Sequence, residues 1–241
     1  NLIDTPGAEN DYITVTDLDR SRLARHPWSL SGGGAVELKR SIEAQSVTRL
    51  DKAIDDLGFG AVTREDDVFR IGTPTCRRLG LLRLGLARPL VAGEEIRDWG
   101  YEAETHAIWP YDTKSLDHRS NDTVERFLWP WKRQLSERTA YGKSQLERGL
   151  AWDEYSMFFR GRYRTPLSIA FAFVATHNHF VLDRGGKVFN RTAPVIKLPQ
   201  GASEDDHLAL LGLLNSSTAC FWMQQVFHNK GGPGEKWHDR Y

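Results

Sequence analysis

The chain has 241 residues, which is enough for one large domain or two small ones with a buried core. Its 32 Lys and Arg residues balance 32 Asp and Glu residues, so the surface cannot be basic throughout. Positive and negative residues can still be concentrated in different parts of it. Cys76 and Cys220 are too few for a disulfide scaffold or a cysteine zinc site, and they suit a reducing cytoplasm. The N-terminus lacks the basic and then apolar pattern of a signal peptide.

The first half of the chain alternates short predicted helices and strands. Residues 1–33 are polar and irregular and are expected to be a linker, followed by a helix over 35–47. Thr48 with Asp51 predicts a capped helix that ends at Gly58. Residues 59–72 indicate a strand, a polar turn and a second strand. A helix with Pro74 in its first turn follows, and then a short strand over 106–111.

The second half begins with a predicted helix over 121–135, capped by Asn121 or Asp122 and ended or kinked by Pro130. Residues 167–176, 179–183 and 193–199 have the composition of strands, and Ser203 with Asp206 predicts the start of a helix over 205–214. Because helices and short strands alternate without a simple βαβ repeat, we expect a mixed α/β (α+β) fold. Its sheet should be mixed and short-stranded, with flanking helices.

Residues 208–227 form the most apolar run, but Asn215 and the hydroxyl residues that follow interrupt it, so we do not expect a membrane span. The pattern predicts two packed helices. Asn215 would take the left-handed exit of the first helix, and Ser216 or Ser217 would cap the second. The expected buried residues are Leu208, Leu210, Leu211, Leu214, Cys220, Phe221, Met223 and Phe227.

Positive charge is concentrated between residues 132 and 164, where eight cationic and four acidic residues give a net charge of +4. Arg160, Arg162 and Arg164 alternate, so an extended chain would place all three on one face. Aromatic residues are interleaved with these cations, as in surfaces that bind nucleic acid, although a solvated helix and loop is an equal alternative. We expect Trp129 and Trp131 to be buried in the core.

Other patterns argue against a complete active site. His177 and His179 could share one face of a strand, but no third metal ligand is evident, and Glu65, Asp66 and Asp67 are expected in a solvated turn. The glycine-rich segment 231–237 lacks the phosphate-loop pattern and is interpreted as a flexible basic loop next to Lys230. No nucleophile elbow, H-E-x-x-H or nuclease motif is found, so no catalytic residue and no metal site are expected.

Six segments in a fixed order resemble one family: "HPWSL", "LGFGAVTREDDVFRIG", "RPLVAGEEIRDWGYEAETHAIWPYD", "FLWPWKRQLSERTAYGKSQLERGLAWDEY", "HNHFVLDRGGKVFNRTAPVIKL" and "LLGLLNSSTACFWMQQVFHNKGG". They are similar to the C-terminal target-recognition half of large adenine-specific DNA methyltransferases. The resemblance is to the TaqI-like and type IIG restriction-modification group, and within it to the methyltransferases of phage growth limitation (BREX-type) defence. Gly60, Thr63 and Phe69 match the frame of a family motif, but Arg64 stands where a second glycine is usual.

The resemblance implies a TaqI-like specificity domain over 34–241, with residues 1–33 linking it to an N-terminal catalytic domain outside this chain. That catalytic domain would bind S-adenosylmethionine and the flipped adenine, and this segment would need no cofactor. The implied setting is the bacterial cytoplasm. The implied partners are double-stranded DNA, the N-terminal methyltransferase domain of the same protein and other phage-defence proteins, with no membrane. The residues expected to bind DNA are Thr63, Arg64, Lys132, Arg133, Arg138, Lys143, Arg148, Arg160, Arg162, Arg164 and Lys230.

Two alternatives remain at this point. The segment could be an interaction module that docks another defence-system subunit without binding DNA. It could also be a hydrolase or nuclease that uses His177 and His179.

Overall fold

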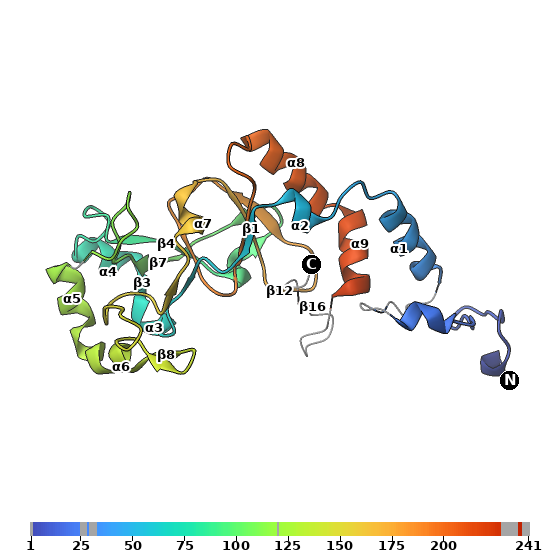
Figure 1. Ribbon diagram of the computed structural model, residues 1–241, viewed down its shortest axis with the longest axis horizontal. Coiled ribbons are helices and arrows are strands. Elements are labelled where there is room, and N and C mark those ends of the chain that lie inside the picture. The colour runs from blue at the N-terminus through green and yellow to red at the C-terminus, as the bar shows by residue number, and fades with distance from the viewer. Residues whose placement is uncertain (1, 25–27, 29–32, 120, 228–235, 238–241) are drawn as a thin grey trace.

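The computed structural model describes residues 2–24, 28, 33–119, 121–227 and 236–237. The molecule is elongated (Figure 1). Helices α1 (Ala35–Ala44) and α9 (Ser217–Val226) lie toward one end, and α5 (Asp122–Leu128) and α6 (Lys132–Glu137) lie at the other. Short strands between these ends form several small sheets, so the expected mixed α/β fold is confirmed.

Two four-stranded sheets occupy the middle of the molecule. The first has the order β1 (Asp56–Gly58), β15 (Val195–Lys197), β11 (Ser168–Phe171) and β13 (Phe180–Asp183), and all its pairs are antiparallel. The second has the order β14 (Val188–Phe189), β4 (Ala87–Val91), β7 (Thr105–Ile108) and β3 (Arg70–Gly72). Its β14–β4 pair is parallel and its other pairs are antiparallel, so this sheet is mixed.

The remaining strands form two-stranded pairs: β2 (Ala61–Val62) with β10 (Met157–Phe158), β5 (Ile96–Arg97) with β6 (Gly100–Tyr101), β8 (Thr139–Ala140) with β9 (Lys143–Ser144), and β12 (Val174–Ala175) with β16 (Lys236–Trp237). The other helical elements are η1 (Leu2–Asp4), η2 (Arg20–Ala24), α2 (Leu50–Ala53), α3 (Asp66–Phe69), α4 (Thr73–Arg78), η3 (Gly93–Glu95), η4 (Trp129–Trp131), α7 (Gly161–Arg164) and α8 (Glu204–Leu214). Within the described residues no helix is both long and apolar enough to cross a membrane.

The apolar side chains of the two ends form separate buried clusters. In the cluster nearer α5 and α6, the fully buried Trp109 packs edge-on against Tyr111, Tyr155 and Phe158. In the other cluster, α8 and α9 cover the first sheet, and their buried side chains meet Ile169, Phe171 and Phe180. Each half of the elongated molecule therefore carries its own core.

Several helix boundaries follow from the predicted caps. The Asn121 side chain accepts a hydrogen bond from the Thr123 amide at the start of α5, and Ser203 and Asp206 form the expected capping box of α8. Pro130 ends α5, because a helix cannot keep its hydrogen bonding through a proline. The chain passes through the 3-10 turn η4 before α6 begins.

Four local expectations were wrong. β2 and β3 do not form a hairpin: each pairs with a distant strand, and the acidic residues between them begin α3. The side chain of Thr48 does not cap α2, whose N-cap is Arg49, and Gly58 lies in β1 rather than at a helix end. Leu208 is 43% exposed, so the buried stripe of α8 is formed by Leu211 and Leu214.

The polar joint between α8 and α9 is tied to the first sheet. Asn215 does not adopt the expected left-handed conformation, since its φ is −89°. Its side chain instead accepts a hydrogen bond from the Phe180 amide at 3.1 Å and donates one to the Phe180 carbonyl at 2.8 Å. Asn178 donates to the carbonyls of Leu214 and Ser216, and Ser216 caps α9 as expected. The polar break therefore docks both helices on β13.

Substituting Asn215→Ala removes two hydrogen bonds to the backbone of the buried residue Phe180. We expect it to lower the free energy of unfolding by about 1–3 kcal/mol, the cost of leaving buried polar groups unpaired. Chemical denaturation measures this loss. Thr218→Ala, at an exposed position of α9, is the control and should change the free energy by less than about 0.5 kcal/mol. Equal losses in both variants would contradict the docking role of Asn215.

Candidate nucleic-acid interface

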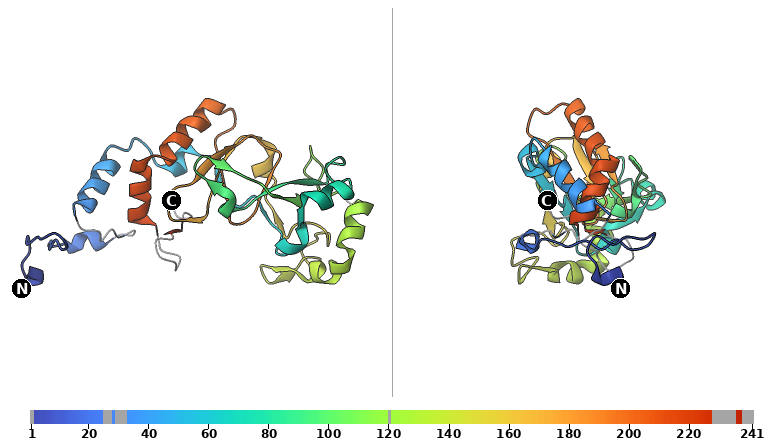
Figure 2. Two further views of the ribbon diagram at one scale, coloured as in Figure 1. Left: turned by 180° about the vertical axis from the view of Figure 1, so that it is seen from behind. Right: turned by 90° about the vertical axis from the view of Figure 1, so that its right-hand side faces the viewer.

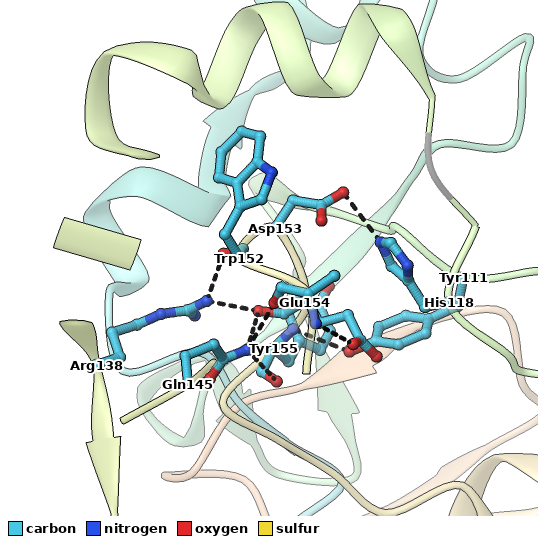
Figure 3. Close-up of polar contacts among 9 residues, drawn as sticks. Tyr111, His118, Arg138, Gln145, Trp152, Asp153, Glu154 and Tyr155 are labelled. Atoms are coloured by element: carbon cyan, nitrogen blue, oxygen red, sulfur yellow. Dashed lines mark hydrogen bonds and ion pairs between the residues drawn. The ribbon is translucent and has the colours of Figure 1, made fainter. Parts of the chain in front are cut away.

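The buried guanidinium of Arg138 organises the end of the molecule that carries α6. Arg138 is 4% exposed and donates hydrogen bonds to four backbone carbonyls: Leu135 at 2.9 Å, Thr63 at 2.5 Å, Trp152 at 2.8 Å and Glu154 at 2.7 Å. Figure 3 shows the bonds to Trp152 and Glu154. Burial lowers the pKa of this guanidinium to about 10, so it stays charged at neutral pH. One side chain thus joins the turn at residue 63, the end of α6 and the loop over 152–154.

A second set of polar contacts holds the loop over 152–154 and the residues next to it. The Gln145 side chain donates to the Ala151 carbonyl at 3.0 Å, and the Tyr155 amide donates to the Tyr111 hydroxyl at 2.9 Å. His118 Nε2 lies 3.0 Å from a carboxylate oxygen of the buried Asp153 (Figure 3). This hydrogen bond raises the pKa of His118. The loop that Arg138 contacts is therefore also tied by hydrogen bonds to Tyr111, His118 and Gln145.

The β8–β9 hairpin projects from this support with an aromatic residue at its tip. Tyr141 has a φ of 54° and Gly142 a φ of 76°, so the turn has the two left-handed residues of a type I′ hairpin. Asn or Gly is usual at the first of these positions, and a tyrosine there is strained. Tyr141 is 85% exposed and is followed by the exposed Lys143. Tyr141 is not among the residues that the sequence predicts to bind DNA. Its local signal in the sequence is the pair "YG", which forms the turn between β8 and β9.

Helix α6 carries two cations beside the hairpin. The Lys132 ammonium lies 4.3 Å from the ring centre of Trp129 and 5.4 Å from that of Trp152. Arg133 is exposed and pairs with Glu137 at 2.9 Å one helical turn later. An exposed pair of this kind contributes about 0–1 kcal/mol, so its arginine can exchange the carboxylate for another anion at little cost.

Trp129 and Trp131 are 60% and 37% exposed, so the expectation that both lie in the core was wrong. The buried positions of this segment are Leu128 and Leu135. Trp129 directly follows Leu128, and each helical residue is rotated by about 100° from the one before. Its ring therefore points away from the core and toward solvent.

The turn before α3 borders α6. Arg64 is exposed and has a φ of 61°, the left-handed conformation that explains why glycine is usual at this position of the family motif. The buried Thr63 accepts a hydrogen bond from the Glu65 amide and donates one to the carboxylate of Asp66, which fixes the turn. Arg64 and Arg133 line one shallow depression of about 530 Å³, together with Glu65, Gln134, Glu137 and Thr139.

The expected extended face of Arg160, Arg162 and Arg164 does not exist, because residues 161–164 form the short helix α7. In a helix, residues two positions apart point about 200° apart. Arg162 forms a two-pronged ion pair with Asp56 at 2.8 Å and donates to the carbonyls of Phe59 and Leu57. These contacts hold the pKa of the Asp56 carboxyl below its usual value.

The expected DNA-facing cations therefore separate into three groups. Arg138, Arg148 and Arg162 are engaged in internal contacts, Arg148 with Ser156. Arg64, Lys132, Arg133 and Lys143 are carried by α6, the β8–β9 hairpin and the neighbouring turn. Arg160, which pairs with Asp117, directly precedes α7, and the exposed Arg164 is the last residue of α7. This helix lies apart from α6 and β8 (Figures 1 and 2). Lys230 lies outside the described residues.

The described residues contain no group of three or more His, Cys, Asp or Glu side chains placed to hold a metal ion. The rings of His177 and His179 lie 6.2 Å apart, and Asn178 between them serves the α8–α9 joint. The exposed groups at the α6 end are instead cations and aromatic rings, which suit an anionic partner.

Comparison with known proteins identifies the relatives of this chain. It is 38% identical over 253 residues to the adenine-specific methyltransferase PglX of Streptomyces coelicolor (strain ATCC BAA-471 / A3(2) / M145), an alignment that covers 99% of this chain. The chain is a relative of PglX. It spans about a fifth of that protein, 21% of its length. The resemblance given by the ordered motifs is thus confirmed. No family model matches the chain.

The fold is shared with a solved restriction-modification enzyme. The type IIL enzyme MmeI, whose structure was determined in complex with DNA, aligns with a TM-score of 0.53 and 14% identity over 82% of this chain and 24% of its own. A weaker likeness, with a TM-score of 0.44 and 14% identity, is to the type IIG restriction endonuclease BpuSI, over 84% of this chain and 25% of that one. The likeness to MmeI shows that this chain shares the fold of a segment of that enzyme.

Substituting Arg138→Ala should destabilise the α6 end strongly. Leaving a buried acceptor unpaired costs about 1–3 kcal/mol. Four carbonyls lose their donor, so we expect a loss of about 3 kcal/mol or more in the free energy of unfolding. Arg133→Ala, an exposed arginine on the same helix, is the matched control, and it should change stability by less than about 1 kcal/mol. Denaturant titration of both variants measures the difference. Similar values would refute the organising role of Arg138.

The His118–Asp153 contact predicts a pH-dependent stability. The pKa of His118 is raised in the folded state, so its contribution is fully present below the unfolded pKa of about 6.5. The contribution is lost as the pH rises through the folded pKa. We expect the stability difference between the natural protein and His118→Gln to shrink as the pH is raised, measured by urea unfolding across that range. A difference that grows with pH would be inconsistent with this contact.

Proposed function

We propose that this chain is the DNA target-recognition region of an adenine-specific DNA methyltransferase. The observation that carries the proposal is the 38% identity to PglX across nearly the whole chain. Methyl transfer, with S-adenosylmethionine as donor, would be done by a catalytic region outside residues 34–241, joined to them through residues 1–33. The target adenine would be flipped into that region, because its amino group cannot be reached inside the base stack.

The geometry at the α6 end supports DNA as the partner. We assign contact with double-stranded DNA to Arg64, Lys132, Arg133 and Lys143, with Tyr141 at the hairpin tip. Cations at this density neutralise backbone phosphates, and an exposed aromatic ring on a rigid turn can stack or wedge against a base. Arg138 and Thr63 would act indirectly, by holding the turn that carries Arg64. The DNA-bound state of MmeI, which shares the fold, agrees with this proposal.

An interaction module that docks another phage-defence protein is the second candidate. The exposed Trp129, Trp131 and Tyr141 favour it, because aromatic residues are enriched in protein interfaces. The two candidates differ in one measurable respect. Salt-dependent DNA binding by the intact protein should be lost when this segment is deleted if the segment reads DNA. The binding should survive the deletion if the segment only docks a protein.

Arg133→Ala and Lys143→Ala test the proposed interface directly. Each should weaken binding of the intact protein to a mixed-sequence duplex and reduce the slope of log affinity against log salt by about one unit, since each removes one phosphate contact. Fluorescence anisotropy over a series of salt concentrations measures both quantities. Lys52→Ala is the matched control, because Lys52 is an exposed lysine of α2, away from α6 (Figure 1). Equal slopes in all three variants would remove α6 and the hairpin from the interface.

A further inference from the structure

A cavity of about 230 Å³ lies between the two four-stranded sheets, away from α6 and the hairpin. Its walls come from β4, from α7 and the residues that follow it, and from the turn between β13 and β14. Pockets for drug-sized organic ligands measure about 300–1,000 Å³, so the size suits a smaller polar group.

The lining of the cavity is strongly basic. Five cationic side chains and one acidic side chain line it. The acidic residue is Asp183, and the cationic residues are Arg88, Arg162, Arg164, Arg184 and Lys187. Three of the cations are already neutralised, because Arg162 pairs with Asp56, Arg184 with Glu204 and Lys187 with Asp183. The guanidinium groups of Arg88 and Arg164 form no hydrogen bond or ion pair with any described residue, which leaves a surplus of two positive charges.

Arg88 is held in a way that presents its donors. Its guanidinium carbon lies 3.7 Å from the ring centre of the buried Trp109, at stacking distance. A stacked guanidinium keeps its N–H donors free in its own plane, where they match two oxygens of an oxyanion. A partly buried cation without an acceptor is unfavourable, and an anion in the cavity would relieve that cost.

Other lining groups fit the same ligand. The Tyr163 hydroxyl is buried beside Gly60 and forms no hydrogen bond of normal length, although the backbone of Phe189 is close to it. Gly185 and Gly186 have φ values of 94° and 80°, and a Cβ at Gly185 would lie 3.0 Å from Pro166. Glycine therefore lets this turn approach Pro166 closely at the wall of the cavity.

We infer that this cavity binds a phosphate group. Two unpaired guanidiniums, from β4 and α7, and the unpaired hydroxyl of α7 line the same cavity. That arrangement suits a tetrahedral oxyanion of charge between −1 and −2 better than a carboxylate. The phosphate can come from the DNA backbone, which rests on the proposed function, or from free phosphate in solution.

Titration of the intact protein with inorganic phosphate tests the site, with potassium chloride at matched ionic strength as the reference. We expect a saturable rise in melting temperature with phosphate alone. Arg164→Ala should weaken phosphate binding about tenfold or more, because it removes a charged donor. Since Arg164 is exposed and unpaired, this variant should fold normally. Arg88→Lys, which keeps the charge but not the fork, should weaken binding in the same direction. Lys52→Ala, at an exposed lysine of α2 that lies outside both proposed sites, is the control and should leave phosphate binding unchanged.

A second arm with a mixed-sequence duplex separates the two sources. If a backbone phosphate occupies the cavity, inorganic phosphate competes with DNA and Arg164→Ala lowers the salt slope by about one unit. If Arg164→Ala abolishes phosphate binding but leaves DNA affinity unchanged, the site serves free phosphate. If the protein binds phosphate but not DNA, the phosphate site stands and the proposed function is refuted. The inference fails if phosphate gives no saturable stabilisation, or if Arg164→Ala binds phosphate as tightly as the natural protein.

Discussion

The buried guanidinium of Arg138 is the contact on which the α6 end of this molecule depends. It satisfies four carbonyls from three segments that are far apart in the sequence. A charged side chain in this position is costly to bury, and only a full set of acceptors makes it stable. Because every partner is a backbone carbonyl, the contact fixes the course of the chain. The turn of Arg64, the end of α6 and the root of the β8–β9 hairpin are positioned together as a result.

The Asn215 joint plays a comparable role at the other end. Asn215 and Asn178 exchange hydrogen bonds with backbone groups of β13 and of the helix ends. The polar residues inside the most apolar run of the chain therefore have a structural purpose: they set the position at which α8 and α9 meet the first sheet. Neither asparagine needs a ligand to explain its presence.

Many helix boundaries were predictable, because a capping residue or a proline determines the backbone structure only within a few residues of its own position. Asn121, Pro130 and Ser203 each marked a helix boundary correctly. The errors came from long-range contacts. Whether Arg162 faces solvent is decided by Asp56, which is about 100 positions away in the chain, and the pairing of β2 with β10 gives no local signal. Composition located the basic segment, but only tertiary structure separates the cations that hold the fold from those that remain exposed.

The fold class followed from the order of the predicted helices and strands, and the relatives of this chain followed from the order of the motifs. The roles of individual side chains did not follow from either. Tyr141 illustrates the gap, since an exposed aromatic residue in a left-handed turn is visible only in three dimensions. Its left-handed backbone is strained, and the contacts of Arg138 hold the segment next to it. Both features are consistent with a residue that contacts a partner. The same holds for Arg88, since the letters "RPLVAG" do not show that its guanidinium forms no ion pair with any described acidic residue.

Site-specific photo-crosslinking from the hairpin tip tests the central claim most directly. A photo-reactive phenylalanine analogue would replace Tyr141 in the intact protein, and in a parallel sample it would replace Lys52. If the α6 end reads DNA, irradiation should link position 141, but not position 52, to a bound duplex. If the protein binds DNA and position 141 forms no crosslink, or if both positions crosslink equally, the α6 end is not the recognition surface.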